Sequence, residues 1–478
     1  MTERTLYWYD YETFGVDPRR DRAAQFAGMR TTESLEPIGQ PLVLYCQPAD
    51  DFLPSPEACL ITHITPQLAQ QRGVGEAEFI RRILEEFSRP GTCVAGYNNL
   101  RFDDELTRQL LYRNFHDPYE REWKNGNSRW DLIDMMRLCA ATRPEGIEWP
   151  RNDEGNVSFR LDRLTQANAI SHGNAHDALA DVQATIAIAS LVKTNQPRLY
   201  DYVYSLRSKP QVEAQLDTVS RKPVLHVSSR YPAGQGCLAL VSPLCRHPTD
   251  SNGIVVCDLR MDPDQWTHLS AEAIQARVFT RQEDLPEDSP RIPLKVIHVN
   301  RCPVVAPATT LEPELARRYG VDLEAVQRHW HKLQGERELS AKLAKVFAQK
   351  NPVPETDPDF MIYSGGFFSE SDRRLMALVR GSNAEQLSRL DIPFKDARLP
   401  EMLFRYRARN FPHTLNQEEQ QHWHRFRRQR LADPQMRDSF EQSMESARKL
   451  CTTDADHQVL DNLQKYVTTL LAGVASQV

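Results

Sequence analysis

The stretch Leu6-Tyr-Trp-Tyr-Asp10-Tyr-Glu12-Thr-Phe-Gly15 carries two carboxylates within an apolar, aromatic run. Its side chains predict a strand over residues 6–11, and residues two apart on a strand project to the same face. Asp10 and Glu12 are therefore expected to lie together. Neighbouring carboxylates repel each other unless a cation lies between them, and oxygen ligands favour Mg²⁺ or Mn²⁺.

The alternative is an acidic strand end that faces solvent. The apolar neighbours of Asp10 and Glu12 indicate a buried strand instead, in which two ionised carboxylates are costly without a partner. We therefore interpret this segment as part of a metal site.

A second acidic segment, Gly96-Tyr-Asn-Asn-Leu-Arg-Phe-Asp103-Asp104-Glu105, leads from a short strand through a turn into a helix. Acidic side chains at a helix N-terminus cap the helix and suit its dipole, so a purely structural role stays open. The spacing alone does not separate Asp103 from Asp104 as a functional residue.

A third segment, Asn174-Ala-His176-Asp177-Ala-Leu-Ala-Asp181, begins a predicted helix over residues 176–193. Asp177 and Asp181 are four residues apart and share one helical face. His176 lies at the mouth of this helix, where it could lean over the group that Asp181 faces. The alternative is a capped helix with an exposed histidine.

The predicted secondary structure changes twice along the chain. Strands and helices alternate over about the first 196 residues, which predicts an α/β domain. Its strands are expected at residues 6–11, 41–46 and 92–97, and its helices at 76–87, 104–112 and 176–193. Four short β-branched runs between residues 222 and 306 predict a small β module, and residues 312–350 are helical in pattern. Residues 351–359 contain three prolines and predict a linker, after which the periodicity of segments 369–386, 415–431 and 434–474 predicts helices only.

The composition of the chain excludes several classes of protein. The chain has 478 residues, 40% of them hydrophobic and 26% charged, as in a soluble globular protein. It has no signal peptide pattern and no apolar run of about 18–20 residues, so a cytoplasmic protein without a membrane segment is expected. The nine cysteines form no CxxC pair, which argues against a zinc site and a disulfide framework. A net charge of −6 argues mildly against an indiscriminate nucleic-acid binder, but local basic patches remain compatible with binding.

The three acidic segments, in this order within one α/β domain, resemble the DEDD exonucleases of the subclass whose last motif carries histidine. The resemblance extends to the exonuclease I family of proteobacteria and covers essentially the whole chain. It is carried by residues 9–15, 97–105, 127–134, 143–147, 158–182, 298–304, 365–369 and 406–412. One departure is Tyr9, where the family has histidine.

The resemblance implies an RNase H-like exonuclease domain over residues 1–196, an SH3-like β domain with added helices over 197–350, and an all-helical domain over 351–478. It implies that two Mg²⁺ ions, replaceable by Mn²⁺, are held by Asp10, Glu12, Asp103 and Asp181, which resolves the ambiguity between Asp103 and Asp104. His176 would then be the general base. The implied reaction is processive 3′→5′ hydrolysis of single-stranded DNA to 5′-mononucleotides, in DNA repair and recombination.

Substrate contacts are expected from aromatic and basic residues, because single strands bind on stacking platforms and basic grooves. The candidates are Phe14, Tyr119, Trp123 and Trp130 for stacking, Arg108, Arg137 and Arg160 for phosphates, and Glu12 for the 3′-terminal sugar. A further set is Arg405, Arg407, Arg409, Arg425, Arg427, Arg428 and Arg430. This set is interpreted as a solvated face, as a wall of a DNA channel, or as a dock for the acidic C-terminal tail of the single-strand-binding protein that the family uses as a partner.

Two other functions stay open from the sequence. The same carboxylates and histidine serve 3′→5′ exoribonucleases, although those relatives are usually short, single-domain chains. A noncatalytic nucleic-acid-binding subunit is the other alternative, and the presence of all five site residues argues against it. The chain is expected to be a monomer that binds the 3′ end of single-stranded DNA.

Overall fold

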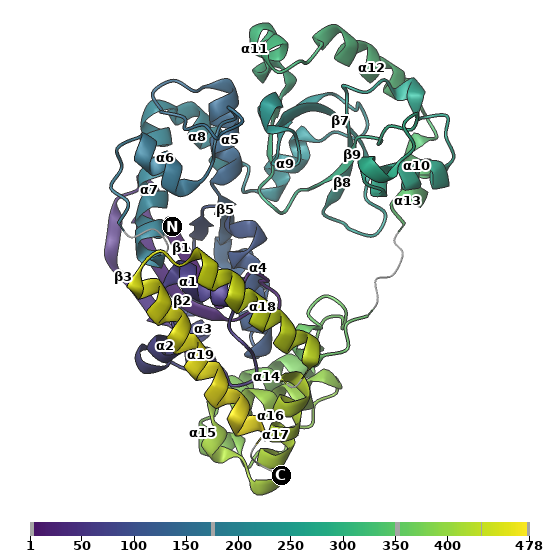
Figure 1. Cartoon of the computed structure of the whole chain (residues 1–478). Coiled ribbons are helices and arrows are strands. Elements are labelled where there is room, and N and C mark those ends of the chain that lie inside the picture. The colour runs from purple at the N-terminus through teal and green to yellow at the C-terminus, as the bar shows by residue number, and fades with distance from the viewer. Residues whose placement is uncertain (1–3, 174–176, 349–353, 432, 476–478) are drawn as a thin grey trace. The chain divides into compact units, whose positions relative to one another are not determined.

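The computed structural model describes residues 4–173, 177–348, 354–431 and 433–475 (Figure 1). The chain forms two compact units. Unit 1 comprises Met1–Ser128, His172–Gln183 and Val353–Val478, and unit 2 comprises Arg129–Ser171 and Ala184–Pro352. The expected domain boundaries at residues 196 and 350 stay a prediction. Among the described residues, no helix is both long and apolar enough to cross a membrane.

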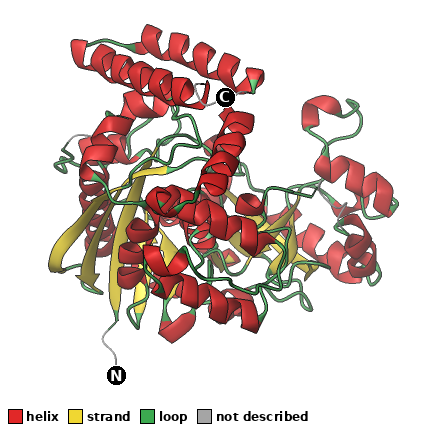
Figure 2. Cartoon of the chain, turned by 90° about the horizontal axis from the view of Figure 1, so that it is seen from below, coloured by secondary structure: helices red, strands yellow, loops and turns green. Residues whose placement is uncertain are grey.

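A mixed sheet forms the centre of unit 1. Its strands are β1 (Thr5–Thr13), β2 (Ala23–Thr32), β3 (Pro37–Tyr45) and β4 (Thr92–Gly96). Their order is β3-β2-β1-β4, followed by β5 (Ser128–Asp131), at which the chain passes out of unit 1. β1 runs antiparallel to β2 and parallel to β4. Figure 2 shows helices beside these strands, so the predicted α/β class is confirmed.

The helices of unit 1 come from both ends of the chain. Those from the first part are α1 (Pro56–Thr62), α2 (Pro66–Arg72), α3 (Glu76–Phe87) and α4 (Asp103–Arg113), and α7 (Ala178–Asn195) begins in this unit. Those from the last part are α14 (Glu370–Gly381), α15 (Ala384–Leu387), α16 (Arg398–Asn410), α17 (Gln417–Leu431), α18 (Pro434–Leu450) and α19 (Asp454–Ala475). The last part is all-helical, as the periodicity predicts.

Successive side chains of β1 point to opposite faces, so its core tyrosines and its carboxylates lie on different sides. Tyr7, Tyr9 and Tyr11 are buried with Phe79 of α3 and Leu106 of α4 in one cluster. Because successive strand residues point to opposite faces, Asp10 and Glu12 project from the other face. The aromatic residues thus fix the strand and leave one face for the acidic side chains.

The C-terminal helices share a hydrophobic core with the first part of the chain. Phe14 and Leu60 are buried in one cluster with Met444 of α18 and Leu460 of α19. Phe115 joins a second cluster with residues of α14 and α16. The backbone N–H of Ala77, in the first turn of α3, donates to the side chain of Asn410 at the end of α16 (2.9 Å). The first and last parts of unit 1 therefore fold as one body.

Buried ion pairs reinforce this shared core. Arg409 contacts Asp51 (2.8 Å) and Asp359 (2.5 Å), and Arg405 contacts Asp359 (3.1 Å). Asp51 and Asp359 are 0% and 1% exposed, and the surrounding arginines lower the pKa of both carboxyls against the opposing effect of burial.

The interpretation of the C-terminal arginines as one solvated face or channel wall is therefore wrong for most of them. Arg405 and Arg407 are buried, the Arg409 side chain is 5% exposed, and Arg427 and Arg430 pair with Asp50 and Asp51. Only Arg425 and Arg428 of the set are exposed. Asp50 and Asp51, which pair with Arg409, Arg427 and Arg430, are more than 350 residues away in sequence, so the local charge pattern does not reveal these contacts.

Unit 2 contains the predicted β module. Its five strands form an antiparallel sheet in the order β10-β6-β7-β8-β9. They are β6 (Val224–Val227), β7 (Leu238–Arg246), β8 (Gly253–Asp258), β9 (Leu294–His298) and β10 (Val304–Pro307). The helices are α5 (Ile133–Thr142), α6 (Leu161–Ala167), α8 (Pro197–Ser205), α9 (Lys209–Gln215), α10 (Ala271–Phe279), α11 (Pro313–Arg318), α12 (Leu323–Gly335) and α13 (Leu339–Val346).

Candidate active site

Three carboxylates converge on the face of β1 opposite its tyrosines. Asp10 and Glu12 project from β1, and Asp181 projects from the first turn of α7. One oxygen from each of the three lies within 4.8 Å of the others. Two segments more than 160 residues apart in sequence are thereby joined at one point, and all of the donors are oxygen atoms.

Asp103 begins α4 and is 6% exposed. It lies outside the 4.8 Å group, but its charge acts on both strand carboxylates. Burial raises the pKa of Asp10 well above its usual range, and Asp103, Glu12 and Asp181 raise it further. Burial, followed by Asp181 and Asp103, raises the pKa of Glu12 to about 9. A cluster of oxygen donors that resists ionisation in this way fits a divalent cation, whose charge offsets the repulsion.

The neighbouring Asp104 has a different environment. Its Oδ1 accepts hydrogen bonds from the Tyr9 hydroxyl (2.8 Å) and from the Arg121 guanidinium (2.6 Å), and both charged side chains are 0% exposed. Asp104 therefore ties α4 to β1 at the point where Asp10 and Asp103 leave the backbone. These contacts favour Asp103 as the member of the pair that acts on the cluster.

Asp177 caps the helix that carries Asp181. Its Oδ1 accepts hydrogen bonds from the backbone N–H groups of Leu179 (3.1 Å) and Ala180 (3.2 Å). The capping alternative from the sequence therefore holds for Asp177. His176, the expected base, lies outside the described residues.

A histidine that the sequence analysis missed contacts the cluster. His172 Nε2 lies 2.6 Å from Asp181 Oδ1, and the two side chains are 8% and 19% exposed. The residue lies nine positions before Asp181 in an irregular segment. No periodicity could have predicted this contact, because a loop has no repeating geometry.

The expected DNA contacts in unit 1 lie in α4 and in the segment after it. Trp123 is 67% exposed, which suits base stacking, and Tyr119 is half-buried. Arg108 lies over the Tyr119 ring (5.3 Å) and donates two hydrogen bonds to Glu122 (2.8 and 3.1 Å). Its guanidinium is therefore already engaged by a carboxylate that a phosphate would have to share or replace.

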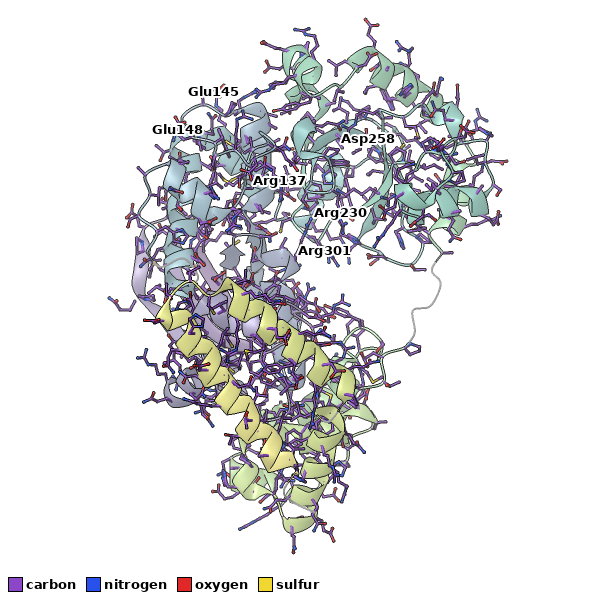
Figure 3. The ribbon with its side chains drawn as sticks, in the orientation of Figure 1. Arg137, Glu145, Glu148, Arg230, Asp258 and Arg301 are labelled. Atoms are coloured by element: carbon purple, nitrogen blue, oxygen red, sulfur yellow. The ribbon has the colours of Figure 1, made fainter. Side chains whose placement is uncertain are left out.

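The other two expected arginine contacts belong to unit 2. Arg160 has a side chain 70% exposed and pairs with Asp162 (3.0 Å). Arg137, which is labelled in Figure 3, projects from α5, is 8% exposed, pairs with Asp134 and lies over the Phe159 ring (5.5 Å).

Two of the proposed stacking residues are in the core instead. Phe14 and Trp130 are each 1% exposed. Phe14 packs against Phe52, and Trp130 packs against Tyr200 and Tyr204. Neither ring is accessible to a base, so the prediction of a stacking role is wrong for both.

Comparison with known proteins covers the chain in three consecutive parts. Residues 7–189 match the family described as Exonuclease, residues 207–349 the Exonuclease I SH3-like domain, and residues 356–470 the Exonuclease I C-terminal domain. The order of the three confirms the predicted fold classes.

Exodeoxyribonuclease I of Escherichia coli (strain K12) is 48% identical over 428 residues, which are 89% of this chain and 90% of that protein. The structure of E. coli exonuclease I in complex with a dA16 oligonucleotide superposes with a TM-score of 0.94 at 44% identity, covering 98% of this chain and 100% of the other. A zinc-bound form of the E. coli enzyme in a complex with single-stranded DNA gives a TM-score of 0.93 at 43% identity, with the same coverage.

Proposed function

Because the chain belongs to the exodeoxyribonuclease I family, we propose that it removes nucleotides one at a time from the 3′ end of single-stranded DNA. The observation that carries the proposal is the convergence of Asp10, Glu12 and Asp181 to within 4.8 Å, with Asp103 acting on the same group. The oligonucleotide complex of the E. coli relative supports single-stranded DNA as the substrate.

Asp10, Glu12, Asp103 and Asp181 would hold two Mg²⁺ ions, with Mn²⁺ able to substitute. Bound there, the ions would activate a water molecule and stabilise the charge that develops on the reacting phosphate. The carboxylate-only donor set favours hard cations. Burial and mutual repulsion raise the pKa values of Asp10 and Glu12, and a bound cation would offset both effects. The zinc-bound E. coli structure supports a divalent-ion site in this family.

Each residue has a separate role in the proposed reaction. His176 accepts the proton of the attacking water, because an imidazole titrates near working pH. Glu12 also contacts the 3′-terminal sugar, and the products are 5′-mononucleotides. Asp177 stays outside the chemistry, because its carboxylate caps α7.

Residues other than the carboxylates bind the DNA strand, by base stacking and by phosphate contacts. Trp123 and Tyr119 stack bases, and Arg108, Arg137 and Arg160 contact phosphates. The high exposure of Trp123 and Arg160 supports these two assignments most directly. Base stacking on an aromatic ring contributes about 1–3 kcal/mol per base.

In the cell, the enzyme acts processively in DNA repair and recombination. It works in the cytoplasm as a monomer, and it binds single-strand-binding protein through the acidic C-terminal tail of that partner. All nine cysteines are free thiols, which suits a reducing compartment. Exposed Arg425 and Arg428 of α17 are candidates for the acidic tail.

The function is tested with single-stranded DNA and RNA, each labelled at the 3′ or the 5′ end, in Mg²⁺ or EDTA. The expected result is early release of the 3′ label from DNA, late release of the 5′ label, and no release in EDTA. Faster release from RNA would favour an exoribonuclease. Binding without hydrolysis in both Mg²⁺ and Mn²⁺ would favour a noncatalytic subunit.

Processivity is tested separately with a trap. Excess unlabelled strand is added after the first turnover, and the nucleotides released per binding event are counted. Long runs are expected, and they should shorten as salt rises, because phosphate contacts weaken with ionic strength. Runs of a single nucleotide at low salt would contradict the processive mode.

A further inference from the structure

The His172–Asp181 contact is not explained by the five residues of the proposed mechanism. The imidazole Nε2 lies 2.6 Å from Asp181 Oδ1, which is a short, charge-assisted hydrogen-bond distance. The His172 side chain is 8% exposed and comes from a segment outside any helix or strand. A loop histidine is thus held against a carboxylate of the cluster.

Hydrogen bonds act on both the backbone and the side chain of Asp181. Its backbone N–H donates to Asp177 O (3.0 Å), and Asp177 caps the same turn, so the start of α7 is held in place. These contacts act on the backbone of Asp181. The contact with His172 acts on the carboxylate itself, so it contributes to the orientation in which the oxygens face Asp10 and Glu12.

We propose that His172 is a positioning residue for the hydrolytic site. It donates its Nε2–H to Asp181 Oδ1 and holds the carboxylate in the orientation that a divalent cation needs. This inference rests on the proposed role of Asp181 as a metal ligand. His172 is distinct from His176, because the role requires only a fixed N–H donor and no exchange of a proton with water.

Residues that hydrogen-bond to metal ligands set the orientation of those ligands, and their loss typically weakens metal affinity or activity about 10–100-fold. His172→Ala should therefore weaken the binding of Mn²⁺ about tenfold. The KM for single-stranded DNA should stay unchanged, because His172 orients a ligand and does not contact the strand. Melting curves check that the variant is folded, because His172 is largely buried and its loss removes one hydrogen bond.

The His172→Gln variant tests whether His172 acts as an N–H donor or as a carrier of protons. The glutamine side chain reaches about as far as the imidazole Nε2 and offers an N–H group, but it does not titrate. It should restore most of the Mn²⁺ affinity that His172→Ala loses. His63→Ala is the matched control, because His63 also faces an aspartate, Asp456 (3.3 Å), in unit 1 but outside the carboxylate cluster.

The experiment is a calorimetric Mn²⁺ titration of the full chain and of the His172→Ala, His172→Gln, His63→Ala and Asp181→Ala variants, with kcat, KM and melting curves for each. Weaker binding in His172→Ala, recovery in His172→Gln and no change in His63→Ala support the inference. Unchanged binding in His172→Ala, while Asp181→Ala loses it, overturns the inference alone. Tighter binding in His172→Ala also overturns it, because His172 would then compete with the ion. Unchanged binding in Asp181→Ala overturns the ligand assignment itself.

Discussion

At the scale of single residues, Glu12 links stability to pH. Its pKa is raised from an ordinary value of 4.5 to about 9 by burial and by Asp181 and Asp103. A carboxyl whose pKa is higher in the folded than in the unfolded state binds more protons when folded, so stability falls as pH rises between the two values. The metal-free protein should therefore lose stability from about pH 4.5 to about pH 9.

Thermal melts in EDTA across this range test the prediction, with Glu12→Gln as the control. The variant should melt higher than the unchanged protein at about pH 8.5, because a neutral amide relieves the repulsion. Added Mn²⁺ should remove most of the pH dependence. A melting temperature that rises with pH in EDTA would show that the cluster is already compensated by other charges.

The pair Asp181 and Asp177 separates chemistry from capping. Asp181→Ala should reduce hydrolysis by several decades while single-strand binding persists, because a ligand of the cluster is lost. Asp177→Ala should cost about 1 kcal/mol of stability, as expected for an N-cap, and should reduce the rate only mildly. Single-turnover rates and melting curves measure both effects. Equal losses of rate in the two variants would contradict the assignment of Asp181, and not Asp177, to the metal site.

At the scale of elements, the contact of β1 with α4 places two carboxylates at once. Asp104 is bonded to Tyr9 of β1 and to buried Arg121, so Asp104→Asn leaves a buried guanidinium uncompensated. Breaking a buried pair costs about 3–5 kcal/mol. Asp103→Asn should instead leave stability unchanged or raise it, because it removes charge from a repelling cluster.

Urea denaturation of the two variants measures this difference directly. Asp104→Asn should be destabilised yet still bind Mn²⁺ when folded, and Asp103→Asn should be stable yet bind Mn²⁺ weakly. The opposite assignment of the two effects would exchange the roles of the neighbouring aspartates.

The same elements show what the sequence could and could not predict. The helix predicted over residues 76–87 is α3, because its apolar residues repeat at helical spacing. β2 was missed, because Ala and Gly, which make up four of its ten residues, are depleted in strands. Its Gly28 is required by a neighbour, since a Cβ there would lie 2.4 Å from the Tyr7 ring. The strand is set by packing that no local pattern encodes.

α16 was missed for a related reason. Its arginines look like a solvated run, and their partners Asp51 and Asp359 lie far away in sequence or in the predicted linker. For the site, the sequence predicts that Asp10, Glu12 and Asp181 lie together, and the structure brings these three carboxylates within 4.8 Å. They come from two separate motifs, and their roles stay a prediction. His172 belongs to no motif and was found only through its distance to Asp181.

At the scale of the whole molecule, unit 1 does not divide at the linker. Phe14 and Leu60 share a core with α18 and α19, and Arg409 pairs with Asp51. A fragment ending at residue 354 would expose this core and leave Asp51 without Arg409. We expect it to be unfolded or aggregated, which circular dichroism and limited proteolysis would measure. A fragment that melts cooperatively near the temperature of the full chain would contradict this prediction.

The assembly of unit 1 from three separate stretches has a consequence for protein synthesis. A nascent chain that has just exposed Asp181 still lacks the helices that complete the unit. At about 5–20 residues per second, the ribosome needs on the order of tens of seconds more to deliver them. A nuclease with this architecture should therefore stay inactive until translation ends. Ribosome-arrested chains stalled after residue 350 should be inert in Mg²⁺, whereas released chains should hydrolyse single-stranded DNA at once; activity in the stalled chains would show that the carboxylates assemble without the C-terminal helices.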